Sequence, residues 1–343
     1  MTIMMRDFNP VPDQKHKPET SLPVSLSDIE KAATRIKGHV SRTPLIHSNS
    51  LSERSGQPVY LKLETRQPIG AFKLRGAMNA ILALNEDERR RGLVTASTGN
   101  HGRAVAYAAQ QLSIPATICM SALVPANKVE AIRSLGAKIR ITGTSQDDAQ
   151  NEVDHLVASH HLISIPPFDD ANVVAGQGTI GLEIIEDLPE ITNILIPLSG
   201  GGLAGGIAAA VKALRPEIHI TGISMERGPA MYAAIQAGKP LSVTEEETLA
   251  DSLGGGIGLN NRITFPLCRA LLDEIMLLSE DEIAMGIRHA AYAEGETVEG
   301  AGAVGIAAIL ADKVQLSGTT AVIVSGCNIA ADLHQKIIAG GIS

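Results

Sequence analysis

Aromatic residues are almost missing from this sequence. It has no tryptophan, and phenylalanine and tyrosine together supply 2% of its 343 residues. Proteins that bind nucleic acids or sugars usually present aromatic rings for stacking, so the composition argues against both classes. The hydrophobic content is still 44%, and a chain of this length and composition predicts an aliphatic core divided between two lobes.

Cysteine is also scarce, with Cys119, Cys268 and Cys327 far apart in the sequence. Such scattered cysteines exclude a disulfide framework or a cysteine-rich metal site, and their odd number indicates a reducing compartment, so we expect a cytoplasmic protein. Residues 1–24 lack the apolar segment of a signal peptide or membrane anchor. They are predicted to form a mobile tail. A net charge of -8 at pH 7 disfavours nucleic acid and anionic membrane surfaces as partners.

Short apolar runs alternate with segments of helical periodicity along most of the chain. This alternation predicts an α/β fold, here two three-layer α/β/α lobes with mostly parallel sheets. Residues 68–161 are predicted to form the smaller lobe, and residues 25–67 with 162–343 the larger one. The predicted strands are 59–63, 93–96, 116–120, 138–141, 194–196, 218–225 and 321–324.

Two helix starts are predicted from local signals. Ser27 and Asp28 precede apolar residues at helical spacing and are predicted to cap a helix that Gly38 ends. Gly176 to Gly181 are predicted to open a helix that leads to strand 194–196. The other predicted helices are 73–84, 104–111, 127–135, 145–159, 202–214, 280–294 and 301–311.

Four polar or glycine-rich stretches lie where predicted strands give way to helices. They are Gly70–Ala77, Ser97–Gly102, Ser199–Leu203 and Ser325–Asn328. Because the carboxyl ends of parallel strands meet at one edge of a sheet, we expect these stretches to share a site. A lysine nucleophile, a glycine-rich anion cradle, an asparagine and a serine could there surround one small phosphorylated ring.

The first stretch contains Lys73 between Phe72 and Leu74. A lysine in this setting either points to water at the start of a helix or is partly desolvated. Desolvation lowers the pKa of a lysine and makes its amine a nucleophile. The neighbouring stretches favour the second interpretation.

The third stretch has the pattern of an anion site, because a glycine-rich turn at a helix N-terminus points backbone N–H groups at a phosphate. The same glycines also fit a dinucleotide-binding pattern, since Gly200, Gly202 and Gly205 follow a strand and Glu226 ends the next one. A NAD-dependent oxidoreductase therefore stays open as an alternative. It would leave Lys73 without a role.

Taken together, the four stretches resemble the fold-type II enzymes of pyridoxal 5'-phosphate (PLP), whose fold is like that of the tryptophan synthase β subunit. Within this group the sequence is similar to the serine/threonine dehydratase (threonine ammonia-lyase) and serine racemase family, from about Ser25 to the end of the chain. The resemblance implies PLP as the cofactor, an amino acid as the small-molecule substrate, and a homodimer. It also implies elimination of water from a 3-hydroxy-α-amino acid such as threonine or serine, with release of a 2-oxo acid and ammonia.

In that family the residue at the Lys73 position binds the cofactor covalently and takes the Cα proton of the substrate, while Phe72 packs beside the cofactor. The resemblance further implies that Asn100 binds the 3-oxygen of the ring and that Ser325 faces the ring nitrogen. A neutral serine cannot keep that nitrogen protonated as an aspartate would, which favours prompt loss of a β-substituent. The implied cofactor-binding residues are Phe72, Lys73, Asn100, Ser199, Gly200, Gly201, Gly202, Leu203, Glu299 and Ser325.

The stretch after strand 93–96 is implied to hold the substrate carboxylate through hydroxyl and N–H groups at a helix start. Thr98 stands where serine racemases carry a serine that acts as an acid on the opposite face of the ring, so it is the second implied catalytic residue. Its extra methyl group is stiff, and we do not expect racemase activity. His101 could instead lie behind the site as a hydrogen-bonded histidine that does not contact the substrate. The implied substrate-binding residues are Ser97, Thr98, Asn100 and His101.

The sequence departs from the family pattern at several positions. Ala71 replaces a serine, Ser199 replaces the first of four glycines, and Gly300 stands where proline is common. The divalent-cation site of the family begins at a glutamate matching Glu226 and needs an aspartate six residues on, where this chain has Tyr232. Magnesium and calcium need oxygen ligands, so no metal site is predicted.

The physiological substrate is left open. Arg66 and Arg103 lie near the site stretches, and either could meet a second anionic group, as in 3-hydroxyaspartate; exposed helix arginines are the alternative. Residues 64–73 and 98–103 resemble the dehydratases of hydroxyectoine catabolism more than the housekeeping threonine enzymes. The candidate substrates are threonine, serine, threo-3-hydroxyaspartate, a phenylserine and 3-hydroxy-2,4-diaminobutyrate. A β-replacement synthase, which needs a second nucleophile, is a further alternative for the reaction.

Allosteric members of the family append a regulatory domain, so this chain is expected to be controlled differently.

Overall fold

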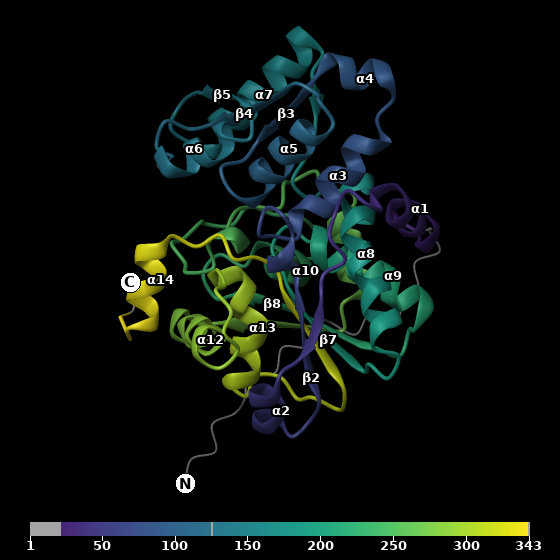
Figure 1. The fold of residues 1–343 in the computed structure, drawn as a ribbon, viewed down its shortest axis with the longest axis vertical. Helices are drawn as coiled ribbons and strands as arrows, with labels where there is room; N and C mark the ends of the chain where they lie inside the picture. The colour runs from purple at the N-terminus through teal and green to yellow at the C-terminus, as the bar shows by residue number, and fades with distance from the viewer. Residues whose placement is uncertain (1–21, 125, 342–343) are drawn as a thin grey trace.

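The computed structural model describes residues 22–124 and 126–341, which form an α/β protein with two sheets (Figure 1). The larger sheet has the strand order β1-β2-β10-β7-β8-β9, and its edge strand β1 runs antiparallel to β2 while the other described pairs are parallel. The smaller sheet has the parallel order β5-β4-β3-β6. The predicted fold class is confirmed. The strands are β1 (Leu45–His47), β2 (Val59–Leu63), β3 (Leu93–Ala96), β4 (Ala116–Met120), β5 (Lys138–Ile141), β6 (Ile163–Ser164), β7 (Asn193–Pro197), β8 (His219–Met225), β9 (Glu274–Leu278) and β10 (Thr320–Val324).

Helices cover both sheets, and the smaller sheet with α4 to α7 lies at the top of the molecule in Figure 1. None of the described helices is long and apolar enough to cross a membrane. The helices are α1 (Leu26–Ile36), α2 (Asn49–Ser55), α3 (Lys73–Ala83), α4 (Glu86–Arg91), α5 (Asn100–Gln111), α6 (Ala126–Arg133), α7 (Gln146–His160), α8 (Ala171–Asp187), α9 (Gly202–Leu214), α10 (Ala230–Ala237), α11 (Thr264–Leu271), α12 (Glu280–Tyr292), α13 (Gly300–Leu310) and α14 (Ala331–Ile338), with 3-10 turns at Glu64–Arg66 and Asp251–Leu253.

The larger sheet is the middle of three layers. Along its central strand β10, Val322 and Val324 belong to the hydrophobic cluster under α12 and α13, whereas Ala321 and Ile323 belong to the cluster under α8 to α11. Successive side chains of a strand point to opposite faces, so this alternation buries both faces of the sheet.

The smaller sheet is built in the same way. Ile118 and Met120 of β4 pack in a cluster with α3 and α5, while Cys119 between them packs with Ala149 and Val153 of α7. Strands β3, β4 and β5 come from the predicted smaller lobe of residues 68–161, whereas β6, which pairs with β3, lies just beyond residue 161. The exact division of the chain into lobes stays a prediction.

The first helix differs in detail from its prediction. Ser25, not Ser27 or Asp28, caps α1: the Ser25 side chain accepts a hydrogen bond from the Asp28 backbone, and the Asp28 carboxylate accepts one from the Ser25 backbone. This reciprocal capping box satisfies two N–H groups at once. Residues 1–21 of the predicted tail lie outside the described residues, and Val24 is buried in a cluster that includes Ile29.

The prediction that Gly176 opens a helix is wrong, because Gly176 to Gly181 lie in the middle of α8. A Cβ on Gly176 would lie 2.6 Å from the Arg75 carbonyl oxygen, and one on Gly178 would lie 2.8 Å from the Gly206 carbonyl oxygen. Real Cβ atoms do not approach so closely. The glycines therefore allow α3 and α9 to pack against α8 backbone to backbone, a benefit that outweighs their low helix propensity.

Candidate active site

Two of the predicted stretches are joined by backbone hydrogen bonds at the carboxyl edge of the larger sheet. Ser325 directly follows β10, and its carbonyl oxygen accepts a 3.0 Å hydrogen bond from the Phe72 N–H. The Cys327 N–H donates in turn to the Gly70 carbonyl oxygen at 2.9 Å. Gly70 has a φ of +73°, and a Cβ there would lie 2.9 Å from the Cys327 sulfur. This turn therefore requires glycine, and it delivers Lys73 to the edge of the sheet.

Lys73 is the first residue of α3, and its side chain is partly buried. Its Nζ donates a 2.7 Å hydrogen bond to the carbonyl oxygen of Pro167 and lies 5.3 Å from the centre of the Phe72 ring. Burial lowers the pKa of Lys73 to about 8, although the negative charge of Glu299 opposes that shift. An amine with such a pKa is partly neutral near neutral pH and can act as a nucleophile or base. The desolvated interpretation of Lys73 therefore fits the structure.

Asn100 and Glu299 meet from two helix starts. The Asn100 Nδ2 donates a 2.7 Å hydrogen bond to Glu299 Oε1, and both side chains are buried. Burial and the charge of Asp251 raise the pKa of Glu299 to about 7, and the hydrogen bond from Asn100 counteracts this shift. The Glu299 N–H also donates a 3.1 Å hydrogen bond to the Gly326 carbonyl oxygen, so Glu299 joins the second and fourth predicted stretches.

His101 is buried beside Asn100, and its Nε2 lies 2.8 Å from the carbonyl oxygen of Ile165. A ring nitrogen that faces a carbonyl oxygen carries the proton, so Nε2 is protonated and Nδ1 is not. The Nδ1 atom has no hydrogen-bond partner among the described residues. Burial, together with the charge of Lys73, lowers the pKa of His101 to about 3. His101 is therefore a neutral, hydrogen-bonded histidine, while Ser97 and Thr98 lie half-buried in the turn between β3 and α5. The roles predicted for these three residues stay predictions.

The glycine-rich loop from Ser199 to Leu203 leads from β7 into the 13-residue helix α9. Gly201 has a φ of +85°, and a Cβ there would lie 2.7 Å from the Met231 side chain. A Cβ on Gly200 would lie 2.5 Å from the Phe168 ring. A side chain at Gly200 would thus meet Phe168, and one at Gly201 would meet Met231. The backbone N–H groups of the loop lie at the positive end of the α9 dipole, as anion binding requires.

The segment that leads from β6 to α8 contributes to the site, and no sequence pattern indicated this contribution. This segment provides Pro167 to Lys73, Ile165 to His101 and the Phe168 ring to the glycine loop. Two of these contacts use backbone carbonyl groups, which any residue type offers, so no local sequence signal could have revealed them. No sequence pattern indicates a role for Asn328 within its stretch.

The two arginines near the site differ in their partners. Arg66 is exposed and forms an ion pair with the buried Glu296. Arg103 is half-buried and donates a 2.8 Å hydrogen bond from Nη1 to Asn328 Oδ1. Arg66 is therefore already paired with a carboxylate, whereas the hydrogen-bond partner of Arg103 is a neutral amide beside Asn100.

Glu226 is exposed, and its Oε1 lies 3.5 Å from the Nζ of Lys313. Tyr232, at the position of the missing aspartate, packs against the hydrophobic cluster under α8 to α11. Within residues 22–124 and 126–341, no group of three or more histidine, cysteine, aspartate or glutamate side chains could hold a metal ion.

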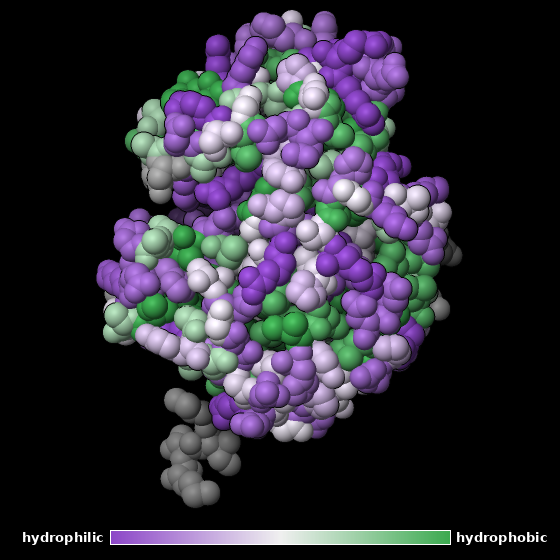
Figure 2. All heavy atoms as spheres, viewed as in Figure 1, coloured by the Kyte–Doolittle hydropathy of each residue, from purple (hydrophilic) through white to green (hydrophobic). Residues whose placement is uncertain are grey.

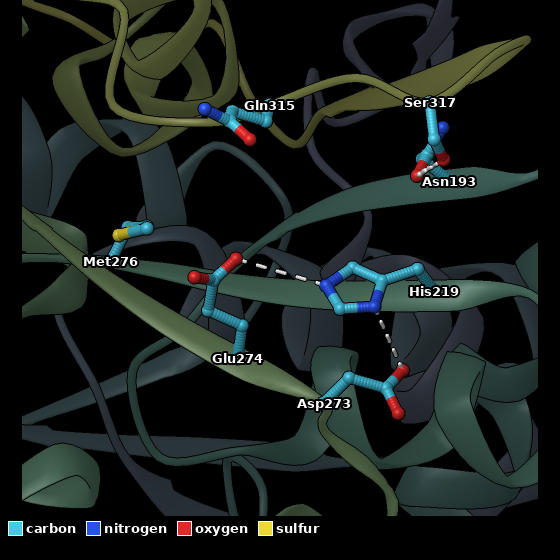
Figure 3. Close-up of a pocket in the computed structure, with 7 residues that line it drawn as sticks. All are labelled: Asn193, His219, Asp273, Glu274, Met276, Gln315 and Ser317. Atoms are coloured by element: carbon cyan, nitrogen blue, oxygen red, sulfur yellow. Dashed lines mark hydrogen bonds and ion pairs between the residues drawn. The ribbon is translucent and has the colours of Figure 1, made fainter. Parts of the chain in front are cut away.

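A separate pocket lies where strands β7, β8 and β9 of the larger sheet begin, at their amino ends (Figure 3). Asn193 and His219 begin β7 and β8 and pair with each other in register, and Glu274 begins β9. His219 lies between Asp273 and Glu274, and the hydrogen bond to Glu274 raises the pKa of His219. Because these residues begin parallel strands, the pocket is opposite the edge that carries Lys73, and it is not part of the candidate active site.

The geometry at the carboxyl edge defines an enzyme site that can hold a phosphorylated aldehyde, with an amine for the aldehyde and a helix N-terminus for the phosphate. Residues 36–326 match the family model described as pyridoxal-phosphate dependent enzyme, and the chain belongs to this family. The cofactor of the family is PLP. The NAD-dependent oxidoreductase alternative is therefore wrong.

The chain is similar to several named proteins and solved structures. A Sinorhizobium fredii protein with the provisional name threonine dehydratase is 58% identical over 318 residues, covering 92% of this chain and 96% of that protein. The L-threonine ammonia-lyase of Thermotoga maritima is 40% identical over 320 residues, covering 93% of this chain and 79% of that protein. The structure of maize serine racemase has a TM-score of 0.87 at 32% identity and covers 92% of this chain and 97% of its own.

The residues at the site fit PLP on structural grounds. Lys73 offers an amine with a lowered pKa, the glycine loop offers a helix N-terminus without side chains, and Ser325 offers a neutral hydroxyl at the end of β10. These are the groups that could hold the aldehyde, the phosphate and the ring nitrogen of the cofactor.

Proposed function

We propose that this protein is a PLP-dependent ammonia-lyase that removes water from a 3-hydroxy-α-amino acid of the threonine or serine type and releases a 2-oxo acid and ammonia. The observation that carries the proposal is Lys73, a partly buried lysine with a lowered pKa at the edge that also holds Asn100, Glu299 and Ser325. The names of two similar proteins, threonine dehydratase and L-threonine ammonia-lyase, support the same reaction.

When bound, PLP supplies an electron sink for the charge that develops at the substrate Cα. Lys73 would hold the cofactor aldehyde in the resting enzyme. During turnover the Lys73 Nζ would take the Cα proton of the substrate, as a neutral amine with a pKa of about 8 can do. The bond from Cβ to the hydroxyl oxygen would break, the Lys73 ammonium would return its proton to that oxygen so that water leaves, and a double bond would form between Cα and Cβ. Hydrolysis of the released enamine yields the 2-oxo acid and ammonia.

The other residues would bind and orient. The backbone N–H groups of residues 199–203 would bind the phosphate, and Phe72 would pack beside the ring. Ser325 would face the ring nitrogen without adding a charge, which favours elimination over a long-lived carbanion. Ser97, Thr98, Asn100 and His101 would hold the substrate carboxylate through hydroxyl and backbone N–H groups at the start of α5, with Thr98 in the position of a racemase acid.

The reaction is tested by assaying ammonia and 2-oxo acid from L-threonine, L-serine and threo-3-hydroxyaspartate, with phenylserine and 3-hydroxy-2,4-diaminobutyrate as further substrates. We expect equal amounts of the two products from one of these compounds without a second nucleophile. Turnover only after addition of a thiol would overturn the proposal and favour a β-replacement synthase. Preference for 3-hydroxy-2,4-diaminobutyrate would support the similarity to dehydratases of hydroxyectoine catabolism.

We also propose that the protein is a homodimer in the cytoplasm. The resemblance to the dehydratase family supports the dimer, and three free cysteines among the described residues, Cys119, Cys268 and Cys327, support a reducing compartment. Light scattering after gel filtration tests the first point, and a monomer mass would contradict it. Fractionation of cells tests the second, and recovery outside the cytoplasmic fraction would contradict it.

A further inference from the structure

A chain of three hydrogen bonds runs from the surface of α5 to the buried carboxylate of the site. Arg103 Nη1 donates to Asn328 Oδ1 at 2.8 Å, Asn328 Nδ2 donates to Asn100 Oδ1 at 2.6 Å, and Asn100 Nδ2 donates to Glu299 Oε1 at 2.7 Å. Each link ends at the residue where the next begins. The two asparagines in the middle therefore have partners on both sides.

The direction of this chain is determined from its Arg103 end, whatever the charge of Glu299. A guanidinium group can only donate hydrogen bonds. Asn328 must therefore turn its oxygen toward Arg103, and Asn100 must turn its nitrogen toward Glu299. A second contact agrees with this assignment, since Asn328 Nδ2 also donates to the carbonyl oxygen of Ile69 at 2.9 Å. A carbonyl oxygen can only accept, so both N–H groups of Asn328 are used.

The orientation of Asn100 matters because the two ends of a side-chain amide have opposite properties. With its oxygen engaged by Asn328 and its NH2 group turned toward Glu299, Asn100 offers N–H groups on the side of the site. A reversed amide would offer an acceptor there, and the oxygen of the amide would lie against the Glu299 carboxylate. Without a fixed partner, an amide can rotate between these two states.

We propose that Arg103 and Asn328 are positioning residues, which hold the Asn100 amide with its NH2 group toward Glu299 so that it presents a donor, not an acceptor, to the ring oxygen of the cofactor. This inference rests on the proposed cofactor role of Asn100. The sequence predicted that Arg103 either contacts an anionic group of the substrate or is an exposed helix arginine. In this proposal it does neither, because it acts on the site through two asparagines.

The test compares Arg103→Met, which removes the donor, with Arg103→Lys, which keeps a group that can only donate. Asn328→Asp breaks the next link with nearly the same shape, and Arg91→Met removes an exposed arginine of α4 as a control. Three quantities are measured on the full chain. They are the dissociation constant of added PLP, its absorption spectrum, and the Asn100 side-chain signal in protein labelled with 15N-asparagine, without PLP. The signal is assigned by its loss in Asn100→Asp.

We expect Arg103→Met and Asn328→Asp to weaken PLP binding about fivefold, the effect of one hydrogen bond, to shift the absorption band, and to displace the Asn100 signal. Arg103→Lys and Arg91→Met should match the wild type in all three. An unchanged Asn100 signal in Arg103→Met would overturn the proposal. If the Asn100 signal moves as expected but the wild type binds no PLP, the hydrogen-bond chain is supported, while the cofactor role of Asn100 and the proposed function are both overturned.

Discussion

Arg75 Nη2 lies 2.8 Å from Glu64 Oε1, and both side chains are completely buried. Arg75 also bonds to Glu183 at 2.6 Å, and the buried Lys62 bonds to the same carboxylate at 2.7 Å. Two cations and two anions thus balance one another and join β2, the turn at 64–66, α3 and α8. Because Lys73 begins α3 two residues before Arg75, this cluster anchors the helix that carries the candidate nucleophile.

Replacement of Arg75 by methionine should be strongly destabilising. The change leaves Glu64 buried without its partner, and removing one member of a buried ion pair typically costs about 3–5 kcal/mol. Denaturant unfolding followed by circular dichroism measures the loss. Arg90→Met, which breaks an exposed pair with Asp87, should change stability by less than about 1 kcal/mol. Equal effects of the two changes would show that the cluster does not hold α3.

The glycines in α8 and α9 lead to a second prediction. A Cβ on Gly206 would lie 2.4 Å from the Val174 carbonyl oxygen, so Gly206→Ala should force the helices apart and lower the free energy of unfolding by about 1–3 kcal/mol. Gly256 has no atom within 4 Å of the same position, and Gly256→Ala should be close to neutral. Thermal unfolding of both variants tests this account, which fails if Gly206→Ala is as stable as the wild type.

Glu299 should make stability depend on pH. Its pKa is raised from 4.5 to about 7 by burial and by Asp251, with Asn100 and Arg103 acting in the opposite direction. A carboxyl group whose pKa is raised on folding contributes stability that is complete below the unfolded pKa and is lost as the pH rises through the folded one. We therefore expect this group to lower the free energy of unfolding by about 3 kcal/mol between pH 4.5 and pH 8.

Glu299→Gln isolates this contribution, because glutamine keeps the shape of the side chain but does not ionise. Unfolding free energies of the wild type and the variant should converge below about pH 4.5, separate as the pH rises toward 7, and stay apart above pH 7, with the variant more stable. Glu130→Gln, an exposed carboxylate on α6, is the matched control. Parallel pH profiles for the wild type and Glu299→Gln would contradict the raised pKa.

Much of the fold could be predicted because local patterns determine it. The strands predicted at 59–63, 93–96, 116–120 and 138–141 coincide with β2 to β5 at both ends. The helix containing Gly176 was misplaced because glycine usually marks a helix boundary, whereas here the packing of α3 and α9 on α8 favours it inside. Local propensity is only a weak guide where helices pack closely.

The candidate site could also be predicted only in part, because local patterns reveal its stretches but not the contacts between distant residues. Its four stretches carry unusual residue combinations and follow strands, so topology brings them together. The contact of Lys73 with Pro167, however, spans 94 residues and uses a backbone carbonyl group. The buried contact of Arg75 with Glu183 spans 108 residues and resembles any pair of surface charges in the sequence. Such long-range contacts become visible only in the folded chain.

The central claim is that Lys73 binds PLP covalently, and the absorption spectrum of the purified protein after incubation with PLP and dialysis tests it most directly. The account predicts a visible absorption band that survives dialysis in the wild type and in Lys37→Ala, an exposed lysine at the end of α1, and that is lost in Lys73→Ala. A band that persists in Lys73→Ala, or a wild-type protein that stays colourless, would contradict it.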